Sequence, residues 1–235
     1  MQIIFHKCHL YKKKKFIQVR IDIMEFSYPP SAGAFKQELM GYMHEILNFH
    51  VQTGSKLYVN MYPFFPYKGS KEIPLDYVLF EPNKGFEDPT TNLFYDNMLF
   101  AKIDSVYFAI SMLGYNGISI CVSETGWPSK GDVDEVGTTL DNAAQYNGNL
   151  ISMVAQNKVT PLKPNSDLDV YIFALFNENM KPGPTSERNF GLFQPNGMPM
   201  YSIRVICGVD SSSAVERYNQ IVLMLILCLA LIALL

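Results

Sequence analysis

A carboxylate follows a short apolar run near the middle of the chain. Residues 118–122 predict a buried strand, and Gly126 and Pro128 force the chain out of it. Glu124 is therefore expected at the carboxyl end of a strand, in a loop. Trp127 is the only Trp of the chain and offers a flat ring of the kind that stacks on pyranose sugars. This pairing indicates a sugar-cleaving site, and the alternative is a solvated loop carboxylate beside a core Trp.

The composition is that of one globular domain. The chain has 235 residues, of which 48% are hydrophobic and 17% charged, so it can bury a sizeable core. The formal net charge of −3 gives no reason to expect a nucleic-acid partner, and the basic run 12–15 is typical of a solvated head. The four cysteines form no framework, and Cys121 is expected to be a small buried hydrophobe. His6, Cys8 and His9 cluster without a second ligand pair, so no metal is predicted.

Strand and helix patterns alternate along the chain. Alternating or apolar runs predict strands, and apolar residues at helical spacing predict helices. The expected strands are 17–23, 57–62, 118–122 and 170–176; the expected helices are 39–54, about 92–114 and 142–154, with a long loop from 63 to 88. This order predicts an α/β fold with parallel pairing and right-handed crossovers.

Seven segments resemble one family in its own order. They are SYPPSAG at 27–33, VNMYPFF at 59–65, LDYVLF at 75–80, SETGWPS at 123–129, NAAQYN at 142–147, YIFALFNEN at 171–179 and NFGLF at 189–193. Together they are similar to the plant β-1,3-glucanases, glycoside hydrolase family seventeen. The resemblance implies a (β/α)₈ TIM barrel, which takes eight strands and typically about 250 residues. Only the last four β/α units are expected here, as a partial barrel over 16–206 after an unrelated stub at 1–15.

The resemblance also implies roles for the charged residues. Glu124 matches the catalytic nucleophile, and Glu178, Lys181 and Glu187 match residues that line the cleft. Retaining glycosidases need a second carboxylate, about 5 to 5.5 Å from the first, as acid/base. The family carries that acid in a Gly-Asn-Glu motif, and none occurs here, so the acid/base is expected to be absent from this chain. Glu178 as a substitute acid, and an ion-pair cluster that holds the loop, remain alternatives.

Several rings and one amide are candidates for binding the substrate. They are Asn60, Tyr62, Phe65, Trp127 and Phe193. Tyr62 follows Asn60 at a strand end, so its hydroxyl could bond the nucleophile carboxylate. Each ring has a core position as its alternative, because aromatic side chains dominate buried area.

The end of the chain predicts a membrane attachment. Residues 221–235 are an apolar run of fifteen, shorter than the roughly 20 residues of a membrane span. The polar spacer 207–220 precedes it, which is typical of a glycolipid (GPI) anchor signal, with a tail-anchored helix as the alternative. The attachment candidates are Gly208, Ser211, Ser212 and Ser213. No signal peptide is recognised at the start, so we expect an incomplete product of a secreted protein of the cell wall or plasma membrane.

The expected activity follows from the resemblance. It is the hydrolysis of internal β-1,3-glucosidic bonds in cell-wall or callose-type glucan by a retaining two-carboxylate mechanism, without a cofactor. The expected partner is β-1,3-glucan. Two alternatives stay open: a catalytically dead glucan-binding surface protein, and a truncated chain that does not fold productively because a half-barrel leaves strand edges unpaired.

Overall fold

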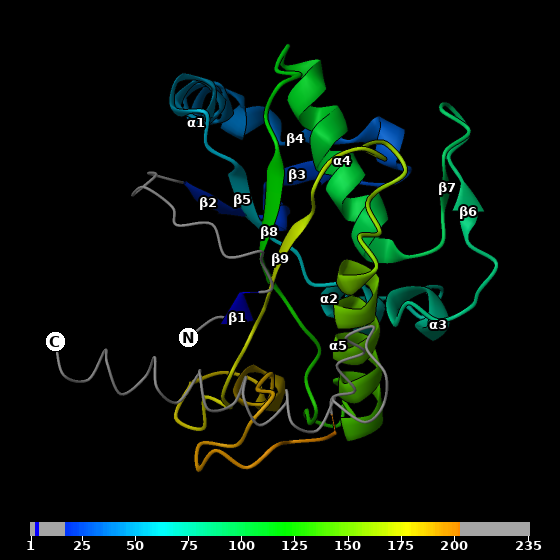
Figure 1. Ribbon diagram of the computed structural model, residues 1–235, viewed down its shortest axis with the longest axis vertical. Helices are drawn as coiled ribbons and strands as arrows, with labels where there is room; N and C mark the ends of the chain where they lie inside the picture. The colour runs from blue at the N-terminus through cyan, green and yellow to red at the C-terminus, as the bar shows by residue number, and fades with distance from the viewer. Residues whose placement is uncertain (1–2, 5–16, 203–235) are drawn as a thin grey trace, which may run out of the picture. The chain divides into compact units, whose positions relative to one another are not determined.

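A sheet of parallel strands forms the centre of the protein. The computed structural model describes residues 3–4 and 17–202 (Figure 1). The parallel strands are β2 (Gln18–Arg20), β5 (Leu57–Asn60), β8 (Ile120–Thr125) and β9 (Asp169–Ile172). Their order across the sheet is β9, β8, β5, β2, and the two-residue β1 (Ile3–Ile4) pairs antiparallel with β9. The predicted parallel pairing of four strands is therefore confirmed.

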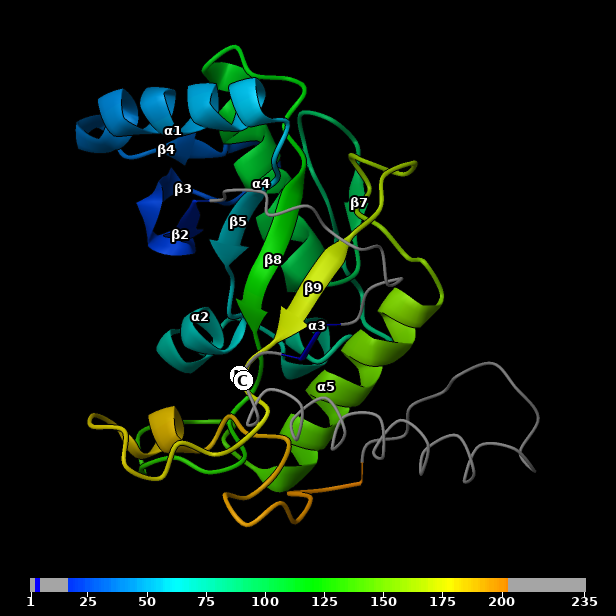
Figure 2. The ribbon, with the colours of Figure 1, turned by 60° about the vertical axis from the view of Figure 1, so that its left-hand side comes forward.

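The strands deliver their carboxyl ends to one edge of the sheet. Within β5, Leu57 and Val59 are fully buried while Tyr58 and Asn60 are half-buried, so the strand has one core face and one open face. An irregularity in the register with β8 places Asn60 beside Glu124. Figure 2 shows the arrowheads of β5, β8 and β9 pointing to the same edge, where α2 and the loop after β9 lie.

Three long helices match the predicted ones. They are α1 (Met40–Thr53), α4 (Met98–Met112) and α5 (Leu140–Ala155). Helices α4 and α5 lie on one face of the sheet, and no helix in the described ranges lies in front of its other face (Figures 1 and 2). Gly54 ends α1 in the left-handed conformation at φ 60°, which a glycine adopts without steric cost. Side chains cap the other two: Asn97 accepts from the Phe100 amide at 2.9 Å, and Thr139 accepts from the Asn142 amide at 3.1 Å.

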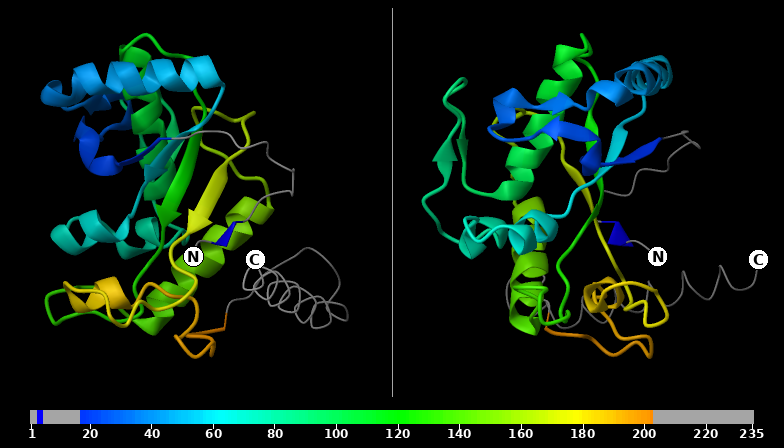
Figure 3. Two further views of the ribbon diagram at one scale, coloured as in Figure 1. Left: turned by 90° about the vertical axis from the view of Figure 1, so that its left-hand side faces the viewer. Right: turned by 180° about the vertical axis from the view of Figure 1, so that it is seen from behind.

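The remaining elements are short. They are β3 (Met24–Phe26) paired with β4 (Ala34–Phe35), β6 (Phe86–Glu87) paired with β7 (Phe94–Tyr95), the helices α2 (Phe64–Gly69) and α3 (Leu75–Val78), and the 3-10 turns η1 (Ile21–Ile23), η2 (Pro30–Ala32), η3 (Gln37–Leu39) and η4 (Thr185–Arg188). The β6–β7 hairpin projects beyond α4, away from the sheet (Figure 3).

Several predicted boundaries were wrong. The predicted loop 63–88 contains α2 and α3. The strand predicted over 17–23 stops at Arg20 and continues as η1. Helix α4 begins at Met98 rather than near residue 92, because the preceding residues pair in the hairpin and Asn97 caps the helix. Strand β8 runs to Thr125, so Glu124 lies within the strand and not in the loop after it.

The core lies between the sheet and the helices on its covered face. Leu57, Val59, Ile120 and Val122 contribute from the strands and meet the buried sides of the helices. A parallel sheet with helices on one face is a TIM-barrel-like α/β arrangement. No helix in the described ranges is long and apolar enough to cross a membrane. The predicted spacer 207–220, tail 221–235 and attachment candidates Gly208, Ser211, Ser212 and Ser213 lie outside these ranges.

Candidate active site

Glu124 is held by two donors at the end of β8. The hydroxyl of Tyr62 donates to Glu124 Oε2 at 2.9 Å, and Gln18 Nε2 lies 3.3 Å from Oε1. The Glu124 residue is half-buried. These two donors fix the orientation of its carboxylate.

A polar group on the adjoining strands supports Glu124. Asn60 Oδ1 accepts hydrogen bonds from Gln18 Nε2 and from Ser123 Oγ, both at 2.7 Å. The Asn60 amide thus joins β5 to β2 and β8. Gln18 bonds both Asn60 and Glu124. Polar side chains of three neighbouring strands, β2, β5 and β8, therefore meet around the Glu124 carboxylate.

Tyr62 acts as a hydrogen-bond donor over the whole physiological pH range. Burial raises the pKa of its phenol well above the ordinary value, and the charge and hydrogen bond of Glu124 raise this pKa further. The ring packs edge-on against Phe65 and Phe190, each with its centroid 5.5 Å away. The predicted contact between the Tyr62 hydroxyl and the Glu124 carboxylate is present.

Lys181 joins two further carboxylates in the loop after β9. Its Nζ lies 3.0 Å from Glu187 Oε2 and 3.2 Å from Glu178 Oε2, and 5.0 Å from the centre of the Phe173 ring. Burial alone would lower the pKa of Lys181, but its bonds to Glu187 and Glu178 outweigh this and raise it. Lys181 therefore stays a cation at the wall of the cleft.

The cleft around Glu124 has a volume of about 220 Å³. It brings together six predicted residues: Asn60, Tyr62, Phe65, Glu124, Lys181 and Glu187. Glu178 does not line it and reaches it only through its ion pair with Lys181. The cleft is also lined by residues that the sequence did not predict: Arg20, Ile21, Asp22, Pro66, Phe173 and Phe190. Gln18 was missed as well, although the alternation of 17–23 signalled a polar face on that strand.

Two of the rings predicted to bind sugar do not line the cleft, and for Trp127 the prediction was wrong. Trp127 is fully buried among Phe64, Tyr67 and Tyr146 and has no surface to offer a sugar. Phe193 packs against the core and Phe176 and does not line the cleft. The core alternative holds for Trp127, whereas Phe193 is half-buried and its role in sugar binding stays a prediction. The rings that do line the cleft are Tyr62, Phe65, Phe173 and Phe190.

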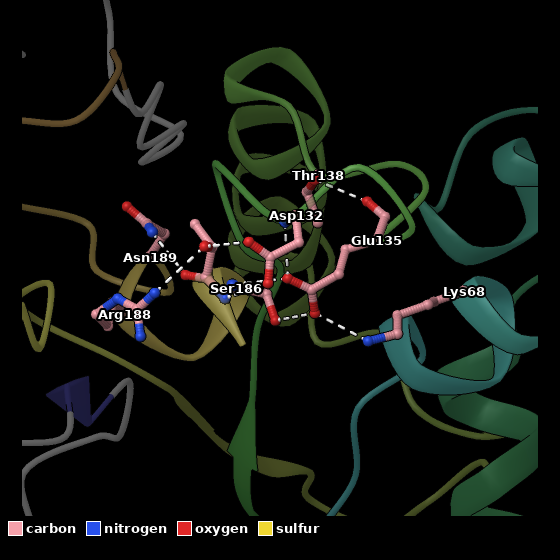
Figure 4. Close-up of polar contacts among 8 residues, drawn as sticks. Lys68, Asp132, Glu135, Thr138, Ser186, Arg188 and Asn189 are labelled. Carbon is pink, nitrogen blue, oxygen red and sulfur yellow. Dashed lines mark hydrogen bonds and ion pairs between the residues drawn. The ribbon is translucent and has the colours of Figure 1, made fainter. Parts of the chain in front are cut away.

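A buried carboxylate outside the cleft fastens its surrounding loops. Glu135 is 3% exposed, and its Oε1 accepts from Lys68 Nζ at 2.8 Å and Ser186 Oγ at 2.5 Å. Its Oε2 accepts from the amides of Asp132 at 3.0 Å and Ser186 at 2.9 Å. Figure 4 shows these contacts meeting between α2, the loop after β8 and η4. We call this group of residues the Glu135 clamp.

The clamp should make stability depend on pH in the acid range. Burial alone would raise the pKa of Glu135, but the bonds from Lys68 and Ser186 outweigh it and lower the pKa from 4.5 to about 2. Its stabilisation is therefore complete above pH 4.5 and is lost as the pH falls towards 2. At 1.36 kcal/mol per unit the loss is about 3 kcal/mol. Urea unfolding should show wild type losing this much relative to Glu135→Gln between pH 6 and pH 2, and parallel pH profiles would contradict it.

The sequence of this chain matches a known family of proteins. The sequence model described as "Glycosyl hydrolases family 17" matches residues 7–205. The chain belongs to glycosyl hydrolase family 17. The family match confirms the resemblance seen in the sequence. It begins inside the segment 1–15 that was expected to be an unrelated stub.

Plant proteins named as glucan endo-1,3-beta-glucosidases align with a large part of this chain. Two from Arabidopsis thaliana are glucan endo-1,3-beta-glucosidase 14, 57% identical over 184 residues, and glucan endo-1,3-beta-glucosidase 11, 58% identical over 186 residues. Each alignment covers 78% of this chain but only 47% and 44% of the relative, so the chain spans about half the length of these relatives.

The solved structure of a β-1,3-glucanase agrees with the fold. The β-1,3-glucanase and allergen CJP38 of Cryptomeria japonica pollen superimposes with a TM-score of 0.78 at 39% identity. The match covers 82% of this chain and 59% of CJP38. The likeness supports the TIM-barrel-like α/β assignment.

Proposed function

We propose that this chain carries the nucleophile part of a retaining endo-1,3-β-glucanase site and binds β-1,3-glucan in the cleft at Glu124. The observation that carries the proposal is the Glu124 carboxylate, which lines the cleft and is held there by Tyr62 and Gln18 beside the partly exposed ring of Phe65. The choice of a β-1,3 linkage in the proposed substrate rests on the relatives that are named as glucan endo-1,3-beta-glucosidases.

The chemistry we propose proceeds in two displacements. One oxygen of Glu124 attacks the anomeric carbon while the bond to the leaving oxygen breaks, and a glycosyl ester forms. Water then attacks the same carbon and releases the carboxylate, and the proton of this water passes to solvent, because the acid/base that would accept it in this second step is expected to be absent. The Tyr62 hydroxyl keeps Glu124 oriented, and Lys181 with Glu187 adjusts the charge of the cleft. Phe65, which is 41% exposed, is the ring best placed to stack on a glucose unit.

The leaving oxygen is the weak point of this site. The family's Gly-Asn-Glu acid motif does not occur in the 235 residues, since Gly148 and Asn149 are followed by Leu150. A sugar alkoxide leaves poorly without a proton, whereas 2,4-dinitrophenolate leaves without one. We therefore propose that the chain cleaves activated aryl glycosides and cleaves glucan slowly.

Two substrates with the same sugar test this proposal. We expect the first displacement, read as the first turnover, to be at least about 10³-fold faster with 2,4-dinitrophenyl β-laminaribioside than with laminarin, because a general acid contributes roughly 10²- to 10⁴-fold to this step. Release of dinitrophenolate and of reducing ends measures the two rates. Failure to cleave either substrate while the chain is retained on insoluble β-1,3-glucan would favour the dead glucan-binding alternative. Equal rates would show that a proton donor is present after all.

We further propose that residues 16–206 are the last four β/α units of a (β/α)₈ barrel. Four parallel strands with helices on one face, and alignments that cover about half of each relative, support this. The location of the parent protein at the cell wall or plasma membrane, with its GPI anchor, stays a prediction of the sequence.

A further inference from the structure

The Glu135 clamp lies outside the cleft but is bonded directly beside it. Glu135 lines no part of the cleft around Glu124. Its carboxylate accepts both the amide and the hydroxyl of Ser186, and Ser186 precedes the cleft residue Glu187. Asp132, from the same loop as Glu135, accepts from the amide of Thr185 at 2.9 Å and from its hydroxyl. Two successive residues of η4 are thus fastened to the loop that leaves the Glu124 strand.

A second set of bonds extends this support to Lys181. Arg188, the last residue of η4, donates from Nη1 to the carbonyl oxygens of Lys181 at 3.2 Å and Gly183 at 2.8 Å. Its Nη2 donates to Thr185 Oγ1 at 3.2 Å. The backbone of Lys181 is therefore bonded to η4, the same turn that carries Glu187, so the two charged cleft residues of the loop after β9 share this support.

A third connection reaches the residue that bonds the nucleophile. Lys68, which pairs with Glu135, lies in α2, and α2 begins two residues after Tyr62. Glu135 therefore joins the segment after Tyr62, the loop after Glu124 and the turn that carries Glu187. The clamp is closely packed, so Glu135 has little room to move: a Cβ on Gly131 would come within 2.8 Å of Glu135 Cβ.

We propose that Glu135 is a positioning residue of the active site, which holds Lys181 and Glu187 in register with Glu124. The inference rests on the proposed function, because it needs chemistry at Glu124. All four bonds at Glu135 come from donors, so an amide at this position turns an NH₂ group toward another donor. The substituted side chain must then move away from that donor. A shift of about 1 Å at a residue that supports the site lowers activity even where the reacting groups are intact.

Trapping of the glycosyl ester measures this effect. In 2,4-dinitrophenyl 2-deoxy-2-fluoro-β-laminaribioside the fluorine slows both displacements, while the good leaving group still allows the ester at Glu124 to form and accumulate. We expect Glu135→Gln to lower the first-order trapping rate about tenfold or more, while the inhibitor concentration for half-maximal rate changes less than about threefold, because the rings that bind the sugar remain. Amide exchange at Ser186 should rise at least about tenfold in the same variant.

Tyr95→Phe is the matched control. It removes another buried bond to a carboxylate, from Tyr95 Oη to Asp104 Oδ2 at 3.0 Å, and neither residue lines the cleft. We expect it to lower stability while the trapping rate stays within twofold. Should Glu135→Gln lack a cooperative unfolding transition, Ser186→Ala carries the test, with an expected three- to tenfold loss of the trapping rate and no loss of the Glu135–Lys68 pair.

The outcomes separate the two proposals. If wild type is labelled and Glu135→Gln keeps the wild-type trapping rate, the positioning role alone is overturned. The same holds if Tyr95→Phe loses as much of the trapping rate as Glu135→Gln does. A folded wild type that is never labelled at Glu124, read by peptide mass spectrometry, would overturn the proposed function and the positioning role with it.

Discussion

Replacing Glu124 with Ala is expected to lower the release of dinitrophenolate from 2,4-dinitrophenyl β-laminaribioside about 10³-fold or more. The reason is that no other carboxylate in the described residues replaces Glu124 at the end of β8, where Tyr62 and Gln18 converge. Removal of a covalent nucleophile leaves only the binding contribution to catalysis. Initial rates of dinitrophenolate release measure the loss directly.

Azide distinguishes a lost nucleophile from a damaged fold. With Glu124→Ala, azide can enter the space of the carboxylate and attack the anomeric carbon as dinitrophenolate leaves, which gives the α-glycosyl azide. We expect rate recovery by added azide and this anomer as the product. Glu87→Ala, which removes an exposed carboxylate of the β6–β7 hairpin, is expected to keep the wild-type rate. Undiminished turnover in Glu124→Ala, or a β-glycosyl azide, would contradict the assignment of Glu124.

Local patterns predicted the elements that position the site. The apolar run before Glu124 specifies a strand whichever neighbours it has, and the spacing of apolar residues specifies α1, α4 and α5. The boundaries were less accurate because they depend on local competition, as at Asn97, whose side chain caps α4 after the hairpin. Pairing with β5 and β9 extends β8 to Thr125, and this cannot be read from residues 118–122 alone.

The missed site residues share a physical reason. Gln18 reaches Glu124 across 106 residues of sequence, and Phe190 meets Tyr62 from the far loop. The alternation of 17–23 marks a polar face for Gln18, and Phe190 lies in a family segment, but neither pattern names Glu124 or Tyr62 as the contact, because only the order of the strands brings these residues together. The charged residues Lys181 and Glu187 were found through the family resemblance, whereas the carboxylate that supports them, Glu135, carries no motif.

Trp127 shows how a correct motif can suggest a wrong role. A ring three residues after a catalytic carboxylate suggests a sugar platform, yet the chain turns inward after β8. The indole packs edge-on against Phe64 at 5.3 Å, lies 5.5 Å from both Tyr67 and Tyr146, and donates from Nε1 to the Gly137 carbonyl at 2.9 Å. Its function is to fix α2 and α5 against the site-bearing strand.

Replacing Trp127 with Ala is therefore expected to lower the free energy of unfolding by about 3 to 5 kcal/mol, because it empties a fully buried aromatic position. Domains of this kind have only about 5 to 15 kcal/mol in total, so the loss approaches global unfolding. Urea titration followed by far-ultraviolet circular dichroism measures it. Trp127→Phe should lose less, since it keeps a ring among Phe64, Tyr67 and Tyr146 but gives up the bond to Gly137.

Replacing Phe65, a ring that lines the cleft, with Ala is expected to affect glucan binding more than stability, the opposite of replacing Trp127. Phe65 is 41% exposed, so its removal should cost about 1 to 2 kcal/mol of stability while it weakens retention on insoluble β-1,3-glucan. Below the denaturation range, folded Trp127→Phe should bind glucan as wild type does. If Trp127→Phe instead lost glucan binding at unchanged stability, the indole would have to reach the sugar, and the buried position that the structure assigns to it would be wrong.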